Sequence, residues 1–444
     1  MRCDGVAPVW LIVDGTRHNL AFHNKSNFGE GRLFRRIAFA LVVWLLATGA
    51  ALAADPLKIG FSMNLTGGSA VNGKQLLAAL EMWRDDVNAK GGLIGRPVQL
   101  VYYDDQSAQA NAPGIYTKLL DVDKVDLVIG PYGTNIIAAT LPVLMQHNMA
   151  TVGMMGLGAN SQFQYGRYFS ILPIGHDAKI AFTQGFFDLV KAQSPKPETI
   201  AIVGADAEFG KTTTDGARDN AKAAGLKIVY DQRYPPNTVD FAPIVRAIKA
   251  TNPDIVFIGA YPPDTVGLVR AASEAALEPK MIGGAMIGLT ATVFKGQLGP
   301  LMNGFVTNEV FVPAPTFNFP GLKEVMTRYQ AQAQSLGTDP LGYGFVPFGY
   351  ASGQVLAAAV EATKSTDAGK IADWLHANTV STVIGDIAFG PDGEWKKSRL
   401  VFTQFQGVTG NSIDQFRDTA KEVVVWPPEF KTGTMIYPYA AAKK

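Results

Sequence analysis

The stretch AIVGADAEFGKTTTDG at residues 201–216 holds residue types that could bind a phosphate group. From Ala205 to Thr212 it reads A-x-x-x-x-G-K-T, a phosphate-loop pattern with alanine in place of the first glycine. Such a loop directs backbone N–H groups, a lysine and a helix N-terminus at an anion. An apolar run precedes the pattern and a predicted helix follows it, so a P-loop nucleotide enzyme is one candidate function.

The loop itself argues against a nucleotide. Asp206 and Glu208 would place two carboxylates beside a triphosphate and repel it. Phe209 is bulky where the backbone must approach the phosphate closely. No apolar strand ends in an aspartate placed to hold magnesium, because Asp254 opens its strand. We therefore expect Lys211 to be a solvated residue of a first helical turn, and the nucleotide enzyme is the weakest alternative.

Other catalytic patterns are missing after residue 53. The three histidines, His147, His176 and His376, are far apart and form no H-E-x-x-H or H-x-H pattern. The sequence has no G-x-S-x-G elbow and no G-x-G-x-x-G opening a helix. The pair Asp104-Asp105 ends a predicted strand, where capping is favoured over a catalytic dyad. We expect a protein that is not an enzyme and needs no cofactor or metal.

The first 53 residues have the layout of a precursor with a secretory signal peptide. A basic stretch, Arg32 to Arg36, precedes an apolar region over 37–52 and the A-x-A pattern Ala51-Leu52-Ala53. A transmembrane anchor is the alternative, but the apolar region is shorter than the ~20 residues that a spanning helix needs. We predict export to the periplasm and a mature chain that begins near Ala54.

The composition is that of a globular protein with a large core. The 444 residues are 47% hydrophobic and carry a net charge of +1. The first 53 residues hold six basic and three acidic side chains, so the charge of the mature chain falls to −2. This gives no electrostatic basis for binding nucleic acid. The only cysteine, Cys3, leaves with the precursor segment, which excludes disulfides and cysteine-ligated metals from the mature chain.

Apolar strands alternate with amphipathic helical stretches along the rest of the chain. This alternation predicts an α/β fold with parallel sheets covered by helices on both faces. Helices are expected near 75–88, 135–147, 211–224 and 265–276. The predicted strands are LKIGFSM, VQLVYYD, VDLVIGP, MATVGMM, TIAIVGA, KIVYDQR, DIVFIGA, KMIGGAM and GFVTNEV.

Five segments run from a strand through a glycine-bearing loop toward a helix. They are KIGFSMNLTG, LVIGPYGTN, AIVGADAEFG, VFIGAYPPDT and KMIGGAMIGLT. The carboxyl ends of parallel strands are where ligands bind in open α/β sheets. Five such loops are too many for one small domain, so we expect two doubly wound, Rossmann-like lobes that face each other across one cleft.

The chain resembles the leucine/isoleucine/valine-binding type of periplasmic solute-binding proteins, the receptors of ABC importers. The similarity begins at KIGFSMNLTGGSAVNGKQLLAALEMW and continues through GPYGTN, ADAEFG, DFAPIVRAIKATNPDIVFIGAY, LGYGFVPFGY and VIGDIAFGPDGEW. It covers nearly all of residues 55–430. The same domain type also occurs in ligand-sensing receptors, which is the first alternative.

The resemblance implies two α/β lobes joined by three crossover segments. One lobe would comprise residues 54–174 and 308–384, the other 175–307 and 385–432, with a tail over 433–444. It further implies a monomer that binds a small ligand between the lobes and works with an ABC permease and ATPase at the inner membrane, without nucleic acid.

Site residues follow from the same comparison of loops. Thr134 falls where the family has a Ser or Thr that binds the ligand carboxylate, and it precedes a predicted helix whose N–H groups favour an anion. Tyr261 falls on a ligand-contacting tyrosine, and Phe209 falls where tyrosine is common. The loops NLTG and GPYGTN add Asn64, Thr66 and Tyr132 as candidate contacts.

Two positions depart from the amino-acid-binding pattern. Gly156 stands where a second carboxylate-binding Thr is expected, and Ala285 stands where an acid receives the ammonium group. Asp264 or Asp206 could replace that acid, although capping or solvation is favoured for both. The remaining loop residues suit an apolar or aromatic carboxylate better than an amino acid or amide, which stay possible. They are Met154, Met155, Phe209, Met286, Phe345 and Phe348.

Overall fold

The computed structural model describes residues 10–13, 16–19 and 55–443. The chain divides into two units, residues 1–54 and 55–444. In the first unit β1 (Trp10–Val13) pairs antiparallel with β2 (Thr16–Asn19). The predicted apolar region 37–52 and the cleavage point after Ala53 lie outside the described residues.

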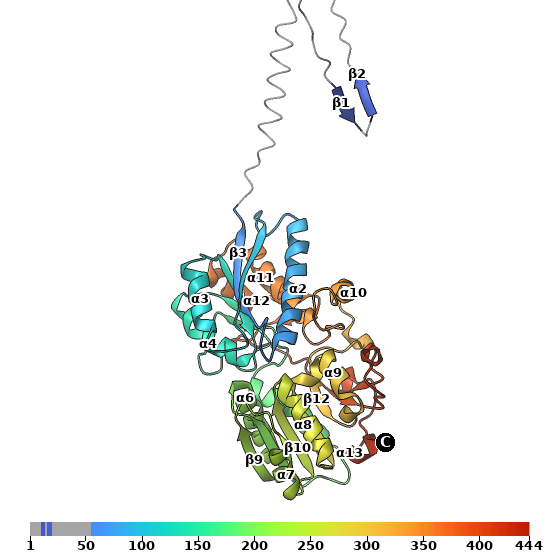
Figure 1. Ribbon diagram of the computed structural model, residues 1–444. Coiled ribbons are helices and arrows are strands. Elements are labelled where there is room, and N and C mark those ends of the chain that lie inside the picture. Colours follow the sequence, from blue (N-terminus) through green and yellow to red (C-terminus); the bar gives the residue numbers. More distant parts are fainter. Residues whose placement is uncertain (1–9, 14–15, 20–54, 444) are drawn as a thin grey trace, which may run out of the picture. The chain divides into compact units, whose positions relative to one another are not determined.

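Five parallel strands form the sheet of the first lobe in the second unit (Figure 1). Their order in the sheet is β4-β3-β5-β6-β7. The chain starts at β3, moves outward to β4 and then crosses back over β3 to β5. The strands are β3 (Leu57–Met63), β4 (Val98–Asp104), β5 (Leu127–Tyr132), β6 (Thr151–Met154) and β7 (Tyr168–Ser170).

Seven strands form the sheet of the second lobe, in the order β16-β15-β12-β11-β10-β8-β9. The five neighbouring strands β12, β11, β10, β8 and β9 are parallel, and β15 and β16 add an antiparallel edge. The strands are β8 (Thr199–Ala205), β9 (Lys227–Tyr234), β10 (Ile255–Ala260), β11 (Met281–Met286), β12 (Val306–Glu309), β15 (Val401–Phe405) and β16 (Glu422–Trp426). A separate antiparallel pair joins β13 (Thr379–Thr382) to β14 (Gly385–Ala388).

Helices cover both faces of each sheet. In the first lobe α2 and α11 pack on one face and α3 and α4 on the other, and in the second lobe α5 and α6 oppose α7 and α8. The helices are α2 (Ala70–Ala89), α3 (Ala112–Asp121), α4 (Thr134–Gln146), α5 (Ala178–Lys191), α6 (Glu208–Ala223), α7 (Ala242–Ala250), α8 (Pro262–Glu274), α9 (Thr292–Leu298), α10 (Leu322–Gln332), α11 (Val346–Thr363), α12 (Ala368–Ala377) and α13 (Tyr439–Ala442).

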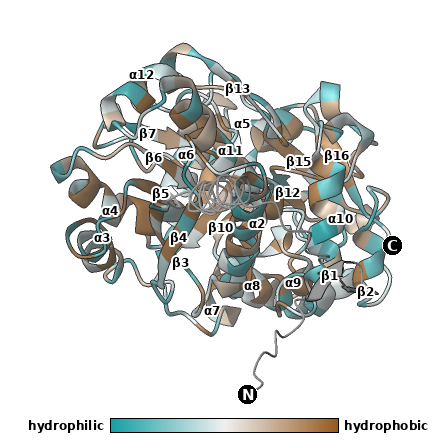
Figure 2. Cartoon of the chain, turned by 90° about the horizontal axis from the view of Figure 1, so that it is seen from above, coloured by the Kyte–Doolittle hydropathy of each residue, from teal (hydrophilic) through white to brown (hydrophobic). Residues whose placement is uncertain are grey.

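The two sides of a strand meet different helices because successive side chains point to opposite faces. Ile129 joins the apolar cluster that contains α2 and α11, whereas its neighbour Val128 joins the cluster of α3 and α4. Figure 2 shows hydrophobic residues on strands of the interior and hydrophilic residues on the outside, as on α10. Within the described residues, no helix is both long enough and apolar enough to cross a membrane.

The chain passes between the lobes three times: between β7 and β8, between β12 and α11, and between β14 and β15. The first and third passages are tied together, since the Trp395 indole N–H donates to the Ser170 carbonyl at 2.9 Å. The predicted fold class, two doubly wound lobes with three crossovers, is confirmed. The lobe boundaries given above stay a prediction.

The nine strands expected from the sequence are all present. Five lie in the parallel part of the second lobe's sheet and four in the sheet of the first lobe. The four expected helices correspond to α2, α4, α6 and α8. The expectation of parallel sheets is incomplete, because β7 and the strands from β13 to β16 were not foreseen. These strands are short or follow irregular segments, so they lack the long apolar run that marks a buried parallel strand.

A glycine sets the approach of α2 to the loop after β3. A Cβ on Gly73 would lie 2.1 Å from the backbone oxygen of Asn64, too close for any side chain. The first turn of α2 therefore packs directly on the loop that carries Asn64.

Replacing Gly73 by alanine should force this loop and α2 apart and destabilise the protein by about 1–3 kcal/mol, as overpacking does. The matched control is Gly114→Ala in α3, where nothing lies within 4 Å of the added Cβ. It should gain about 0.5–1 kcal/mol because alanine loses less entropy in a helix. Urea unfolding followed by circular dichroism measures both, and equal effects of the two substitutions would contradict the packing argument.

Candidate functional site

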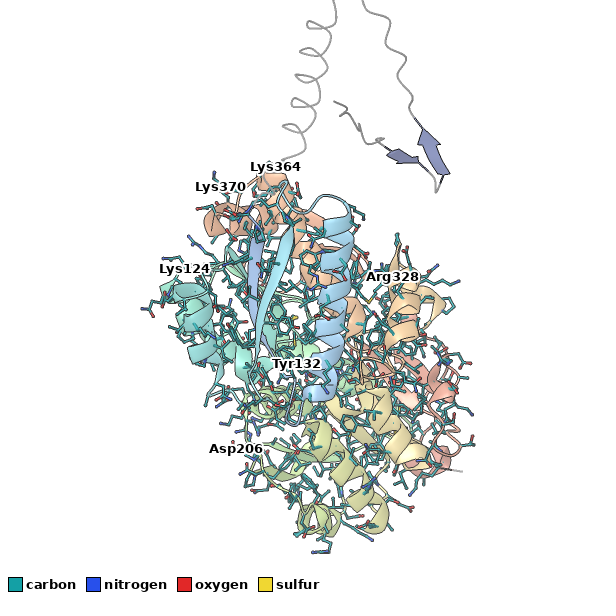
Figure 3. The ribbon with its side chains drawn as sticks, turned by 45° about the horizontal axis from the view of Figure 1, so that its top comes forward. Lys124, Tyr132, Asp206, Arg328, Lys364 and Lys370 are labelled. Carbon is teal, nitrogen blue, oxygen red and sulfur yellow. The ribbon has the colours of Figure 1, made fainter. Side chains whose placement is uncertain are left out.

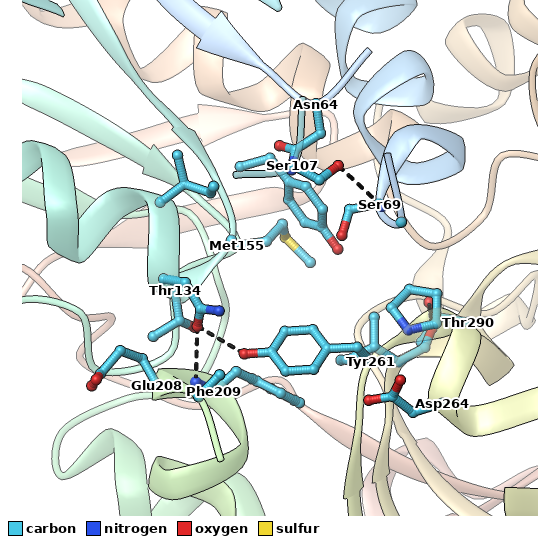
Figure 4. A pocket seen from close by; sticks show the side chains of 18 of the residues that line it. Asn64, Ser69, Ser107, Thr134, Met155, Glu208, Phe209, Tyr261, Asp264 and Thr290 are labelled. Carbon is cyan, nitrogen blue, oxygen red and sulfur yellow. Dashed lines mark hydrogen bonds between the residues drawn. The ribbon is translucent and has the colours of Figure 1, made fainter. Parts of the chain in front are cut away.

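A cavity of about 500 Å³ lies between the two lobes (Figure 4). Its walls come from the carboxyl ends of parallel strands in both sheets, the edge at which α/β sheets bind ligands. The first lobe contributes residues after β3, β5 and β6, and the second lobe contributes residues after β8, β10 and β11. Figure 3 shows Tyr132 and Asp206 in this region, well apart from Lys364 and Lys370 at the far end of the first lobe.

Six of the ten residues predicted to contact a ligand line this cavity. Met155 does so with a left-handed backbone, φ +60°, a conformation that is uncommon for a side chain other than glycine. The six are Asn64, Tyr132, Thr134, Met155, Phe209 and Tyr261.

Thr66 and Gly156 lie outside the lining of this cavity, and their role as ligand contacts stays a prediction. The Thr66 hydroxyl donates to Asp104 Oδ2 at 2.6 Å and holds the loop after β3 in place. Gly156 is packed against the core, since a Cβ there would lie 2.6 Å from Ile137 Cδ1 and 2.9 Å from the Tyr168 hydroxyl oxygen. Gly156 therefore supports the cavity wall from behind.

Ala285 and Met286 also lie outside the lining, because both belong to strand β11 itself. Ala285 is buried in the sheet opposite Gly259 of β10. Met286 is buried in the apolar cluster between the sheet, α8 and the neighbouring helices. The cavity wall near this strand is formed one residue later, by Ile287. Met154 and Phe348 are likewise core residues, whereas Phe345 reaches the cavity.

Thr134 begins α4 directly after the turn at Gly133, whose φ of +91° favours glycine. The Thr134 side chain is 5% exposed, and its Oγ1 accepts the N–H of Leu157 at 2.9 Å. The first N–H groups of a helix have no partner within the helix, so they attract an anion. The start of α4, at Thr134, therefore presents N–H groups that can attract an anion at this end of the cavity.

Asn135 connects the two lobes across the cavity. Its Oδ1 accepts the Phe209 N–H at 3.1 Å and the Tyr261 hydroxyl at 2.8 Å, and both donors belong to the second lobe (Figure 4). The sequence places Asn135 beside Thr134, but nothing in it shows that this side chain turns toward the other lobe.

Aromatic rings form much of the remaining wall. Phe209 contacts Tyr261 with ring centroids 5.6 Å apart and Phe182 at 6.0 Å, and Tyr132 contacts Phe345 at 5.4 Å. Burial raises the pKa of both Tyr132 and Tyr261 well above the usual value, so both hydroxyls stay neutral. These rings can enclose a flat or branched apolar group.

Asp264 is a buried acid in the cavity wall and lies in the first turn of α8. Its hydrogen bond with the backbone of the N-cap residue Tyr261 agrees with the capping interpretation, whereas its burial rules out the solvated one. It is 6% exposed and accepts the Tyr234 hydroxyl at 3.1 Å. Burial raises the pKa of its carboxyl to about 6. Asp206, by contrast, is half exposed and lies 3.4 Å from Lys211 Nζ.

The A-x-x-x-x-G-K-T stretch is the junction of β8 and α6. Only Asp206 and Ala207 separate the strand from the helix, which leaves no loop to surround a phosphate. A Cβ on Gly210 would lie 2.1 Å from the Ala205 carbonyl oxygen, so this glycine allows the helix to pack on the strand end. Within residues 55–443 and the two N-terminal strands, no group of three or more His, Cys, Asp or Glu is placed to hold a metal.

Several lining residues were not foreseen from the sequence. Asn308 lies in β12 and Phe182 lies in α5, elements with no loop motif to mark them. Ser69 and Ser107 line the cavity from two loops of the first lobe, where the Ser107 hydroxyl accepts the Ser69 N–H at 3.2 Å. Contacts that bring distant segments together, and no local pattern, place these residues at the site.

Comparisons with a family model and with individual known proteins point to the same family. The family model described as periplasmic binding protein matches residues 56–409. The Leu/Ile/Val-binding protein of Escherichia coli (strain K12) is 27% identical over 345 residues, which cover 77% of this chain and 89% of that protein.

Solved structures share the fold. A branched-chain amino acid transporter substrate binding protein from Streptococcus pneumoniae, in complex with isoleucine, has a TM-score of 0.69 at 18% identity and covers 84% of this chain and 100% of its own. A solute binding protein of an ABC transporter from R. palustris, in complex with benzoate, has a TM-score of 0.69 at 18% identity and covers 83% of this chain and 95% of its own.

The family predicted from the sequence motifs is thus confirmed. The solute-binding function of the ABC importer type is also confirmed over the sensor and nucleotide-enzyme alternatives. The cavity between two α/β lobes and the family match over most of the chain agree with this function. The chain belongs to the periplasmic binding protein family.

Proposed function

We propose that this protein is the periplasmic receptor of an ABC importer and binds a small apolar or aromatic carboxylate between its lobes. The observation that carries the proposal is the cavity, which joins the anion-binding start of α4 to a wall of aromatic rings. No covalent chemistry is needed for this role. The related Leu/Ile/Val-binding protein and the benzoate complex name ligands that all bear a carboxylate.

The ligand carboxylate is expected at Thr134. The helix dipole and the free N–H groups of α4 favour a negative charge there. The Thr134 hydroxyl accepts one N–H and retains its proton, so it can donate to a carboxylate oxygen. The apolar part of the ligand then packs against Phe209 and Tyr261.

An amino acid is the second candidate, and Asp264 is the observation that favours it. A buried ionised carboxylate in the wall could receive an ammonium group, which would offset the cost of burying both charges. Burial raises the pKa of the Asp264 carboxyl, and the groups that hydrogen-bond it, the Tyr234 hydroxyl and the Tyr261 backbone, are neutral. The two candidates therefore differ at Asp264: an amino acid would place a positive ammonium group beside it, whereas a simple carboxylate would not.

The proposed transport role also predicts where the protein acts and which proteins it works with. Residues 1–53 would direct export and be removed, and the mature protein would act as a monomer in the periplasm. Closure of the lobes on the ligand would create the surface that a permease with its ATPase recognises. Mass spectrometry of ligand released from the purified protein tests the ligand class directly.

Replacing Thr134 by valine should weaken binding of 3-phenylpropionate by about 1–3 kcal/mol, because a hydrogen bond to a charged group is lost. Calorimetry measures this affinity. Thr117→Val, at an exposed position of α3, is the matched control and should leave the affinity unchanged. Equal affinities of the wild type and the Thr134→Val protein would place the carboxylate elsewhere.

Replacing Asn135 by alanine should open the lobes and weaken ligand binding by about 1–3 kcal/mol, since two hydrogen bonds between the lobes are lost. Tyr261→Phe removes one of the two bonds and should have a smaller effect. Small-angle scattering of the ligand-free protein should show a larger radius of gyration for Asn135→Ala. The exposed Asn318→Ala serves as control, and an unchanged scattering profile for Asn135→Ala would refute the bridging role.

The pH dependence of binding separates the two candidate ligands. Asp264 is protonated below about pH 6 and ionised above it. An ionised Asp264 repels a simple carboxylate but attracts an ammonium group. Affinity for 3-phenylpropionate should therefore fall between about pH 5 and about pH 8, whereas affinity for phenylalanine would rise if Asp264 received its ammonium.

Calorimetry over this pH range should show the first trend, and Asp264→Asn should abolish it. The 2-oxo acid phenylpyruvate completes the matched series at pH 7. If phenylalanine binds tightest by tenfold or more, the ligand is an amino acid and the proposal of a simple carboxylate is wrong.

A further inference from the structure

Met155 is held in a backbone conformation that its residue type disfavours. Its φ of +60° lies in the left-handed region, where the Cβ atom of an L-residue crowds the following carbonyl oxygen. A residue in such a conformation persists only where the surrounding structure fixes it, and strain of this kind gathers at functional sites. Met155 is half-buried and lines the cavity between the lobes.

Two common explanations of a left-handed residue do not apply to Met155. The first is the end of a helix, and five left-handed residues follow α3, α4, α7, α8 or α11 within three positions: Lys124, Asn148, Asn252, Ala276 and Lys364. The second is a side chain that hydrogen-bonds the nearby backbone, as the Ser107 hydroxyl does with the Ser69 N–H at 3.2 Å and the Thr66 carbonyl at 2.7 Å. Met155 follows strand β6, and its thioether is only a weak acceptor.

The neighbours of Met155 fix its backbone on both sides. The Met154 carbonyl accepts the Gly133 N–H at 3.0 Å, and the Leu157 N–H donates to Thr134 Oγ1 at 2.9 Å. Both bonds tie this segment to the start of α4, so the chain cannot relax away at the residue between them. The contacts that hold Thr134 in place therefore also impose the strained conformation on Met155.

The Met155 side chain occupies the middle of the site. Figure 4 shows it between the Thr134 end of the cavity and the region of Ser69 and Ser107. A ligand whose carboxylate lies at Thr134 must direct its apolar part into the remaining space, where it meets the thioether. An acid with a longer apolar part can reach the region of Ser69 and Ser107 only by passing Met155.

We propose that Met155 sets the upper length of the ligand, because its thioether closes the cavity behind the apolar group of a carboxylate held at Thr134. The protein keeps a strained backbone at this position in order to place the thioether there. A flexible methionine packs against apolar groups of irregular shape, which suits this role. The inference rests on the proposed carboxylate-binding function and adds the residue that selects among carboxylates by size.

Calorimetry with acids of increasing length tests the size limit. The wild-type protein should bind 3-phenylpropionate more tightly than 4-phenylbutyrate and 5-phenylpentanoate. Met155→Ala removes three heavy atoms, and each methylene that is newly buried gains about fourfold in affinity. The ratio of the affinity for 5-phenylpentanoate to that for 3-phenylpropionate should therefore rise about tenfold or more in Met155→Ala.

Two further variants serve as comparisons in the same series. Met155→Leu keeps a side chain of similar volume and should restore the wild-type ratio to within about threefold. Met145→Ala is the matched control, because Met145 is a half-buried methionine of α4 outside the cavity lining. It should leave the ratio unchanged.

Thermal unfolding of the ligand-free protein tests the strain. Met155→Gly and Met155→Ala both lack the thioether and differ only in the Cβ atom, which is strained at a positive φ. Met155→Gly should therefore unfold at a temperature about 1–3 °C above that of Met155→Ala. The order should reverse in helix α4, where glycine is the poorer helix former, so Met145→Gly should unfold below Met145→Ala.

Each outcome points to one conclusion. If none of the acids binds the wild-type protein, the proposed function fails and the length limit falls with it. If the acids bind but the affinity ratio is unchanged in Met155→Ala and Met155→Gly, only the length limit is overturned. A wild-type protein that already binds 5-phenylpentanoate as tightly as 3-phenylpropionate overturns it as well. A Met155→Gly protein that unfolds below Met155→Ala overturns the argument from strain. The unfolding transitions also show that each variant folds.

Discussion

The arrangement of the site depends on one carboxamide oxygen. Asn135 Oδ1 receives a backbone N–H from Phe209 and a hydroxyl from Tyr261, and both donors come from the opposite lobe. Because α4 fixes Asn135 at the end of β5, these two bonds determine where the loops after β8 and β10 lie relative to the first lobe. They also hold the two rings in contact at 5.6 Å. The aromatic wall and the position of one lobe relative to the other are therefore one structural feature, and a ligand that packs on the rings favours this position.

This bridge is possible because parallel strands all end at the same edge of a sheet. Each lobe presents its strand ends and helix starts to the cleft, which gathers polar loop residues and free backbone N–H groups without burying them in the core. The loops are kept short by close packing between helices and strand ends. Gly73 lies against the Asn64 carbonyl and Gly210 against the Ala205 carbonyl, and neither site has room for a Cβ. The helices can thus begin directly at the cavity.

The G-K-T letters at 210–212 illustrate how packing decides the use of a motif. In a phosphate loop the glycine lets the backbone approach an anion, whereas here it lets α6 approach β8. The carboxylates that argued against a nucleotide are used differently from each other: Asp206 lies near Lys211, while Glu208 opens the helix. Acidic residues at a helix start are favourable on their own account, because they interact with the helix dipole.

The sequence by itself determined the fold class, the family and the loops that meet at the cleft, since apolar strand runs, helix starts and glycine positions are local patterns. The family resemblance singled out Thr134, Phe209 and Tyr261, and all three line the cavity, although their contact with a ligand stays a prediction. Only the tertiary structure decided which neighbours face the cavity: Ile287 does and Met286 does not, and Asp264 is buried in the wall instead of solvated. It alone placed Asn135 between the lobes and Asn64 with Asn308 on one cavity. The reason is physical: burial and hydrogen bonding of these side chains depend on segments that are distant in the chain, and no local pattern encodes the direction in which a side chain meets them.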